Sequence, residues 1–111
     1  MKMDSLDLVF KALAHPIRRR ILDLVADQDG CNVNQVCSHF EVSRISVLRH
    51  INVLEEAGLL TSEKRWRDRL LYFNAVPIQL IYDRWTSKYS ALWARDLARI
   101  KYAIESEEEP L

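Results

Sequence analysis

The sequence predicts a mainly α-helical domain that carries one β-hairpin and ends in a long helix. Four segments before Gly58 place their apolar residues at helical spacing, and two short apolar runs flank a charged connector between residues 59 and 73. A third observation is the stripe of aromatic and aliphatic residues that recurs at helical steps from Tyr82 to Ile104. The 111 residues suit one compact domain, expected over residues 1–104, followed by an acidic flexible tail over residues 105–111.

A proline separates the first two predicted helices. The first follows Asp4 or Ser5 as N-cap, and its apolar stripe consists of Leu6, Val9, Phe10 and Leu13. His15-Pro16 ends this helix and starts the next, because proline is accommodated at the first helical position. The second helix ends before Asp29-Gly30, and its apolar stripe consists of Ile17, Ile21, Leu24 and Val25.

The third and fourth helices are predicted to form a helix-turn-helix. Asn32 caps the short third helix, whose stripe is Val33, Val36, Cys37 and Phe40. Ser43 caps the fourth, which ends at Gly58 and whose inner stripe is Val47, His50, Ile51 and Leu54. Glu41-Val42 leaves room only for a tight turn between the two helices, which is the helix-turn-helix arrangement.

A β-hairpin follows the fourth helix. Residues 59–62 and 70–73 are predicted strands, and residues 63–69 form the charged connector between them. A hairpin in this position is called a wing. The predicted fold class is therefore a mainly α winged helix-turn-helix with a two-stranded β-wing and a long C-terminal dimerisation helix.

The last helix is expected over residues 77–104, beginning at Pro77. About 28 residues would make a helix roughly 42 Å long, and its apolar stripe is too long for one small protomer to cover. Because exposed apolar surface of this extent normally marks an interface, we expect a homodimer. The alternative is a helix folded back on its own core. The predicted interface residues are Leu6, Phe10, Tyr82, Trp85, Tyr89, Trp93, Leu97 and Ile100.

Composition excludes several classes of protein. The chain has only two glycines and lacks glycine-rich phosphate loops and nucleophile–base motifs, so we predict no enzyme activity and no cofactor. We expect no membrane contact, because no apolar run approaches the roughly 18 residues of a membrane span. Two cysteines cannot form a disulfide-rich framework, which favours a cytoplasmic location. Net charge is zero, but the last residues are rich in glutamate, so the remainder of the chain is basic.

Two segments resemble the ArsR-type winged helix-turn-helix repressors. The first is Phe10-Lys11-Ala12-Leu13-Ala14-His15-Pro16-Ile17-Arg18-Arg19-Arg20-Ile21-Leu22. The second is Ser43-x-x-x-Val47-x-Arg49-His50-Ile51-x-x-Leu54-Glu55-Glu56-Ala57-Gly58-Leu59. With the wing and the last helix, the resemblance covers roughly residues 6–104. It implies a homodimeric transcriptional regulator that represses by binding an inverted-repeat operator in double-stranded DNA.

The residues opposite the inner stripe of the fourth helix are predicted to contact DNA. They are Ser43, Arg44, Ile45, Ser46, Leu48, Arg49 and Asn52. Arginine and asparagine can bond to base edges or phosphates, the aliphatic residues can touch thymine methyl groups, and the serines suit phosphates. The wing supplies four cations for phosphates or a minor groove: Lys64, Arg65, Arg67 and Arg69. The alternative for both surfaces is an ordinary solvated face. Leu48 departs from the family, which usually has a small hydroxyl residue there.

Other polar and aromatic residues have more than one interpretation. The family commonly has a glycine near the wing tip, where this chain has Trp66, and we favour packing of Trp66 against the protein over contact with DNA. At least one arginine of residues 18–20 is expected to pair with Asp23. We interpret His50 as a histidine at the edge of the core. Of the other histidines, His15 is expected to cap or precede the second helix, and His39 to face solvent.

The metal-binding sets of the family are incomplete in this chain. Residues 32–36 hold no thiol, and no histidine follows His50, so we predict no metal site. Cys37 is expected to be a small buried residue, and Cys31 to lie in an accessible loop, which leaves a thiol-redox-responsive repressor open. A further alternative is a protein-interaction module whose basic wing docks an acidic partner. The sequence names no small-molecule effector.

Overall fold

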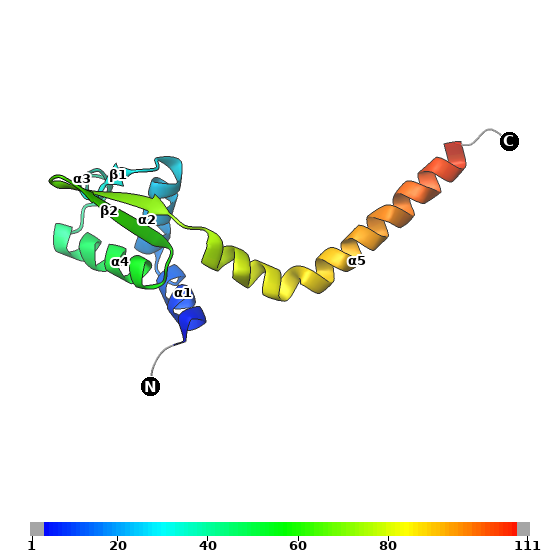
Figure 1. Cartoon of the computed structure of the whole chain (residues 1–111), viewed down its shortest axis with the longest axis horizontal. Coiled ribbons are helices and arrows are strands. Elements are labelled where there is room, and N and C mark those ends of the chain that lie inside the picture. Colours follow the sequence, from blue (N-terminus) through cyan, green and yellow to red (C-terminus); the bar gives the residue numbers. More distant parts are fainter. Residues whose placement is uncertain (1–3, 109–111) are drawn as a thin grey trace. The chain divides into compact units, whose positions relative to one another are not determined.

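A computed structural model describes residues 4–108, which are mostly helical (Figure 1). The elements in chain order are α1 (Ser5–Leu13), α2 (Pro16–Asp27), β1 (Cys31–Asn32), α3 (Val33–Cys37), α4 (Arg44–Glu56), β2 (Leu60–Arg65), β3 (Asp68–Phe73) and α5 (Val76–Glu108). The chain divides into two compact units, one ending at Gln79 and the other beginning at Leu80.

Side chains cap three of the helices where the sequence predicts them. The backbone N–H of Ile17 donates to Nδ1 of His15 over 3.1 Å at the start of α2. Asn32 and Gln35 form a reciprocal capping box at α3, in which each side chain accepts from the other residue's backbone N–H over 2.8 Å. The Ser43 hydroxyl accepts from the N–H of Ser46 over 3.2 Å at the start of α4. These bonds satisfy donors that a helix N-terminus otherwise leaves unpaired.

The wing is part of a three-stranded antiparallel sheet with strand order β1-β3-β2. β1 was not predicted, and it pairs Cys31 with Leu71 on β3. The predicted wing strands were also too short, because pairing continues outward to Arg65 and Asp68 and leaves a two-residue turn. Most of residues 63–69 therefore lie on strands rather than in a connector.

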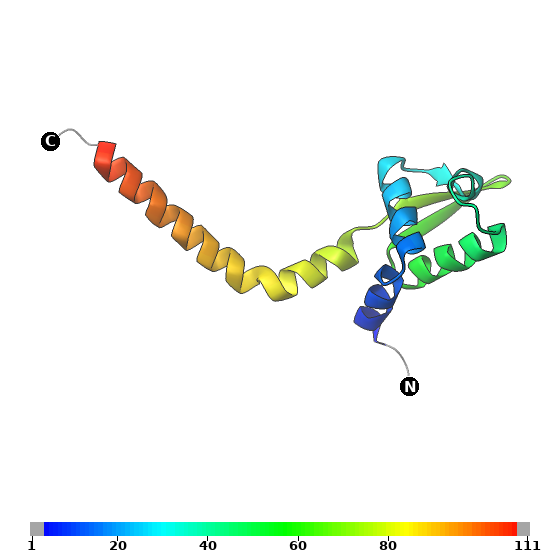
Figure 2. The same ribbon diagram turned by 180° about the vertical axis from the view of Figure 1, so that it is seen from behind.

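The core of the first unit lies between the helices and the sheet. α2 packs on β3 and α4 on β2, while α1 packs against both α2 and α4 (Figure 2). The buried apolar side chains are Val9, Ala12, Ile21, Leu22, Val25, Cys31, Val33, Val36, Val47, Ile51, Leu54, Ala57, Leu59, Leu60 and Leu71. The inner stripe of α4 is thus confirmed for Val47, Ile51 and Leu54, and His50 beside them is half-buried.

α5 is a long helix whose apolar residues are exposed. It extends four residues beyond the predicted end at Ile104, so residues 105–108 of the expected flexible tail are helical. Residues 109–111 of that tail lie outside the described residues. Trp85, Tyr89 and Trp93 have exposed fractions of 55%, 75% and 66%. Within residues 4–108, no helix is both long enough and apolar enough to cross a membrane.

Candidate nucleic-acid interface

The outward face of α4 presents polar and aliphatic side chains side by side. Arg44, Ile45, Arg49 and Asn52 are exposed, whereas Leu48 is half-buried. Ile45 keeps 65% of its surface exposed, although it lies only two residues before the buried Val47. This face combines hydrogen-bond donors, an amide and an apolar group, the combination that reads base edges in a major groove.

The wing carries its predicted cations on both strands and in the turn. Lys64 and Arg65 are exposed at the end of β2, Arg67 is exposed in the turn, and Arg69 is half-buried on β3. In the register of the hairpin, Lys64 lies opposite Arg69 and Arg65 opposite Asp68. The pairing places the cations near one end of the hairpin rather than along its whole length.

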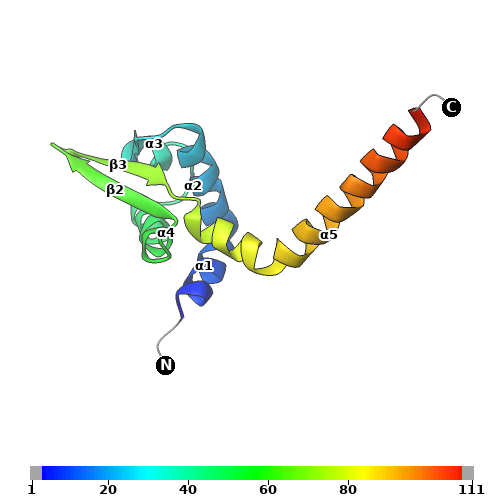
Figure 3. The same ribbon diagram turned by 45° about the vertical axis from the view of Figure 1, so that its right-hand side comes forward.

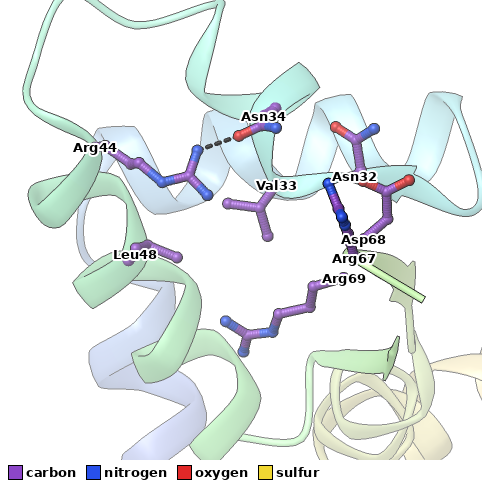
Figure 4. Close-up of a pocket in the computed structure, with 8 residues that line it drawn as sticks. All are labelled: Asn32, Val33, Asn34, Arg44, Leu48, Arg67, Asp68 and Arg69. Carbon is purple, nitrogen blue, oxygen red and sulfur yellow. Dashed lines mark hydrogen bonds between the residues drawn. The ribbon is translucent and has the colours of Figure 1, made fainter. Parts of the chain in front are cut away.

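A cleft of about 100 Å³ lies between the wing and the helix-turn-helix (Figure 4). Three predicted DNA-contacting arginines meet there from three elements: Arg44 from α4, Arg67 from the turn and Arg69 from β3. The other lining residues are Asn32, Val33, Asn34, Leu48 and Asp68. The lining holds three arginines and one acidic residue, Asp68, so the cleft is electropositive and suited to an anion.

Two of these arginines are oriented by residues that the sequence interpretation missed. Nη1 of Arg44 donates to Oδ1 of Asn34 on α3. Nη2 of Arg69 donates to Oε1 of Glu55 on α4, forming an ion pair, and also to Oδ1 of Asn52 over 3.5 Å. Asn34 and Glu55 could not be found from local spacing, because each partner lies at least ten residues away in sequence.

Trp66 does not pack against the protein, so that prediction was wrong. Its side chain is 84% exposed in the turn between β2 and β3. The guanidinium of Arg67 lies 5.0 Å from the centre of its ring. The reason is the length of the hairpin: pairing out to Arg65 and Asp68 carries the turn away from the core that the indole was expected to cover.

Arg18 and Arg19 on α2 bind backbone carbonyl groups rather than Asp23. Arg18 donates from Nε to the carbonyl of Ala12 over 2.8 Å and from Nη2 to that of Lys11 over 2.7 Å. Arg19 donates to the carbonyl of Leu13 over 2.8 Å. The expected ion pair with Asp23 is therefore wrong, because the C-terminal carbonyls of α1 lie closer to these side chains and need donors.

His50 is a satisfied histidine at the edge of the core, as predicted. Nη1 of Arg18 lies 3.2 Å from its Nδ1, and because arginine only donates, this nitrogen accepts. The ring of His15 lies 4.4 Å from that of His50 between centroids. Burial lowers the pKa of His50, and the neighbouring His15 and Arg18 lower it further.

Neither cysteine has its expected environment. Cys31 was expected in an accessible loop, but it is buried on β1, and Cys37 is half-buried rather than buried. Burial raises the pKa of the Cys31 thiol. A backbone hydrogen bond lowers this pKa and the negative charge of Asp29 raises it, and the net shift is upward. A raised pKa and burial both oppose thiolate chemistry. Among the described residues, no three His, Cys, Asp or Glu side chains form a group able to hold a metal ion.

Known proteins resemble this chain in sequence and in fold. A helix-turn-helix domain family matches residues 13–63. The HTH-type transcriptional regulator YuzN of Bacillus subtilis strain 168, itself uncharacterized, is 31% identical over 85 residues, covering 71% of this chain and 92% of YuzN. The crystal structure of an ArsR family transcriptional regulator superposes with a TM-score of 0.69 at 26% identity, covering 82% of this chain and 98% of that one. This chain belongs to the ArsR-type helix-turn-helix transcriptional regulators.

Two further relatives agree with this assignment. The transcriptional repressor SdpR of B. subtilis strain 168 is 35% identical over 57 residues, which cover 51% of this chain and 62% of SdpR. An ArsR-like transcriptional regulator from Rhodococcus sp. RHA1 has a TM-score of 0.64 at 27% identity, covering 96% of this chain and 95% of its own. These relatives are regulators of transcription and not enzymes, in agreement with the sequence prediction.

Proposed function

We propose that this ArsR-type regulator is a repressor that binds an inverted-repeat operator as a homodimer. The observation that carries the proposal is the exposed face of α4, with Arg44, Ile45, Arg49 and Asn52, beside the cleft that Arg67 and Arg69 complete. A helix-turn-helix places its second helix in the major groove, so α4 is the reading helix.

The side chains of α4 would divide the work of recognition. Arg49 would bond to the O6 and N7 acceptors of guanine, Asn52 to adenine, and Ile45 would touch a thymine methyl group. Arg44 donates to Asn34 and lines the cleft, so we assign it to a backbone phosphate rather than a base. Leu48, which is half-buried, would contact the major groove with the part of its side chain that remains exposed.

The wing would hold the duplex backbone. Lys64 and Arg65 are exposed cations on β2, and the cleft between the wing and the helix-turn-helix is lined by three further arginines. Contacts of this kind release counterions from DNA and add affinity on any sequence. They would also fix the register of α4 in the groove.

The exposed apolar residues of α5 support a homodimer. Six of the predicted interface residues lie on this helix and are exposed: Tyr82, Trp85, Tyr89, Trp93, Leu97 and Ile100. A second copy of the same helix offers a matching surface in a twofold arrangement. On α1, Phe10 is exposed and Leu6 half-buried, and both would join the edge of this seam. The symmetry of such a dimer would be repeated in its operator.

Repression is the regulatory outcome that the relatives favour, since SdpR is a transcriptional repressor. A dimer bound over a promoter would exclude polymerase or neighbouring factors. The test is a gel shift of the full chain with the DNA upstream of its own gene, beside an unrelated duplex of equal length. We expect a retarded band with the upstream DNA at lower protein concentration. Equal retardation of both duplexes would overturn sequence-specific binding, and no retardation of either would instead favour a protein partner.

A further inference from the structure

Trp66 adopts a backbone conformation that a tryptophan rarely takes. Its φ is 59°, in the left-handed region, and among residues 4–108 it is the only non-glycine residue with a positive φ. Glycine, asparagine and aspartate enter this region most readily, whereas a large side chain there is disfavoured. A two-residue hairpin turn requires a positive φ at a central position, which explains the backbone conformation but not the choice of tryptophan.

The surroundings of Trp66 within the protein give no reason for an indole at this position. The side chain is 84% exposed, the highest value among the exposed large apolar residues of the described chain. Its ring contact is with the guanidinium of Arg67, which is itself exposed. The turn that holds both residues has only two positions, so the indole and the guanidinium are presented together.

The position and the positive charge of the wing tip also suit contact with DNA. The hairpin of β2 and β3 projects beyond the helices of its unit (Figure 3). Exposed Lys64, Arg65 and Arg67 surround Trp66, and the acidic residues nearby are Glu63 and Asp68. The apolar ring thus lies within a basic surface, which is the environment of a side chain that enters a groove of nucleic acid.

We propose that Trp66 and Arg67 form a probe that the wing inserts into the minor groove of the duplex. This inference rests on the proposed function. The indole would enter edge-on with its faces against deoxyribose, and its N–H would donate to adenine N3 or thymine O2. The guanidinium of Arg67 would follow the negative potential of a narrow A·T minor groove. The probe therefore adds a preference for A·T pairs beside the site read by α4.

Fluorine NMR of the full chain tests the position of the ring. The protein is labelled with 5-fluorotryptophan, which gives resonances for Trp66, Trp85 and Trp93, and Trp66→Phe assigns the first. On addition of a 30-bp A·T-rich duplex at low salt, the Trp66 resonance should shift while the two α5 resonances serve as internal references. Netropsin, which fills A·T minor grooves, should reverse the shift. A shift that persists with netropsin, or no shift in the bound protein, would overturn the proposal.

Two substitutions separate binding from folding. Trp66→Gly and Trp66→Asn both suit a left-handed turn, so the melting temperature should be unchanged or higher. Affinity for the A·T-rich duplex should fall roughly tenfold, the loss expected for one buried apolar contact. Wild-type affinity in both variants would refute the minor-groove probe but would leave the proposed function unaffected. A wild-type chain that binds no duplex at any salt concentration would refute the proposed function itself.

Discussion

The arginines of the candidate interface differ in the hydrogen-bond partners that their guanidinium groups have within the protein. Arg44 bonds to Asn34, and Arg69 to Glu55 and Asn52, so their guanidinium groups are already oriented toward the cleft. Arg49 is exposed on the face of α4 that would enter the major groove. A side chain held in place suits a fixed phosphate, whereas the exposed one is available to a base edge.

Replacing Arg49 with alanine should weaken specific more than non-specific binding. The variant loses a bidentate contact to guanine, so affinity for the selected operator should fall by about 1–3 kcal/mol. Fluorescence anisotropy with operator and unrelated duplexes measures both values. Arg20→Ala, an exposed arginine on α2, is the matched control and should change neither. Equal losses on the two duplexes would assign Arg49 to a phosphate.

His50 makes the stability of the fold depend on pH. Because burial, His15 and Arg18 lower its pKa, the folded protein keeps the neutral ring that accepts from Arg18. As the pH falls through the ordinary histidine pKa, the unfolded chain binds a proton more readily than the folded one. The free energy of unfolding should therefore be full above that pKa and decrease below it.

Urea unfolding at pH 7.5 and 5.5 tests this sign. His50→Asn keeps an oxygen acceptor for Arg18 but cannot bind a proton. Wild-type protein should lose more stability between the two pH values than this variant does. The interpretation fails when both proteins show the same dependence on pH.

At the scale of elements, one ion pair ties the wing to the reading helix. Arg69 on β3 bonds to Glu55 on α4, and both side chains are partly exposed, at 31% and 27%. A pair of this kind contributes at most about 1 kcal/mol to stability. Its larger effect is to set where the guanidinium points and to offset its positive charge.

Glu55→Gln should strengthen non-specific DNA binding. The glutamine still accepts a hydrogen bond, but the positive charge of Arg69 is no longer neutralised, so the slope of log affinity against log salt should steepen by about one phosphate contact, roughly 0.9. A salt titration on a mixed-sequence duplex measures it. Glu56→Gln is the matched control, an exposed neighbour on the same helix. Identical slopes in the two variants would show that Arg69 takes no part in binding.

The helical elements could be predicted because their signals are local, although α3 ends at Cys37, before Phe40 of its predicted stripe. His15-Pro16, the Asn32 capping box, Ser43 and Gly58 mark helix ends within a few residues, and Gly58 has the expected left-handed φ of 77°. Strand β1 has two residues, too few to show alternation, and it forms only because β3 lies beside it. The burial of Cys31 was missed for the same reason.

The cleft could be predicted only in part. The cations that line it followed from the position of α4 and the wing. Asn34 and Glu55 were missed because their roles depend on contacts between elements distant in sequence. The extended pairing of β2 with β3 also decides the exposure of Trp66. Charged residues from 63 to 69 are typical of a loop, although all of them except Arg67 pair across the two strands.

At the scale of the whole molecule, binding to an inverted repeat requires two copies of the chain. The apolar stripe of α5 is exposed in the single chain, including Tyr89 at 75% and Trp93 at 66%. Burying such rings in a seam of two helices would remove a large apolar surface from water. Pairing of two chains would also bring two α4 helices into one assembly.

Trp93→Glu should convert the dimer to monomer. A carboxylate in the seam is costly to bury, so sedimentation at micromolar concentration should give the mass of one chain. Ser87→Glu, an exposed position of α5 off the stripe, is the control and should remain dimeric. Operator affinity should fall with the loss of the dimer. A wild-type chain that is itself monomeric at this concentration would refute the seam.

Selection of bound DNA from a random duplex pool tests two proposals in one experiment: that α4 recognises a base sequence, and that the protein binds as a symmetric dimer. We predict an enriched inverted repeat whose half-site centres lie about one helical turn apart, roughly 34 Å. Enrichment of a single half-site without dyad symmetry, or of no sequence at all, would contradict a twofold pair of α4 helices that reads an operator.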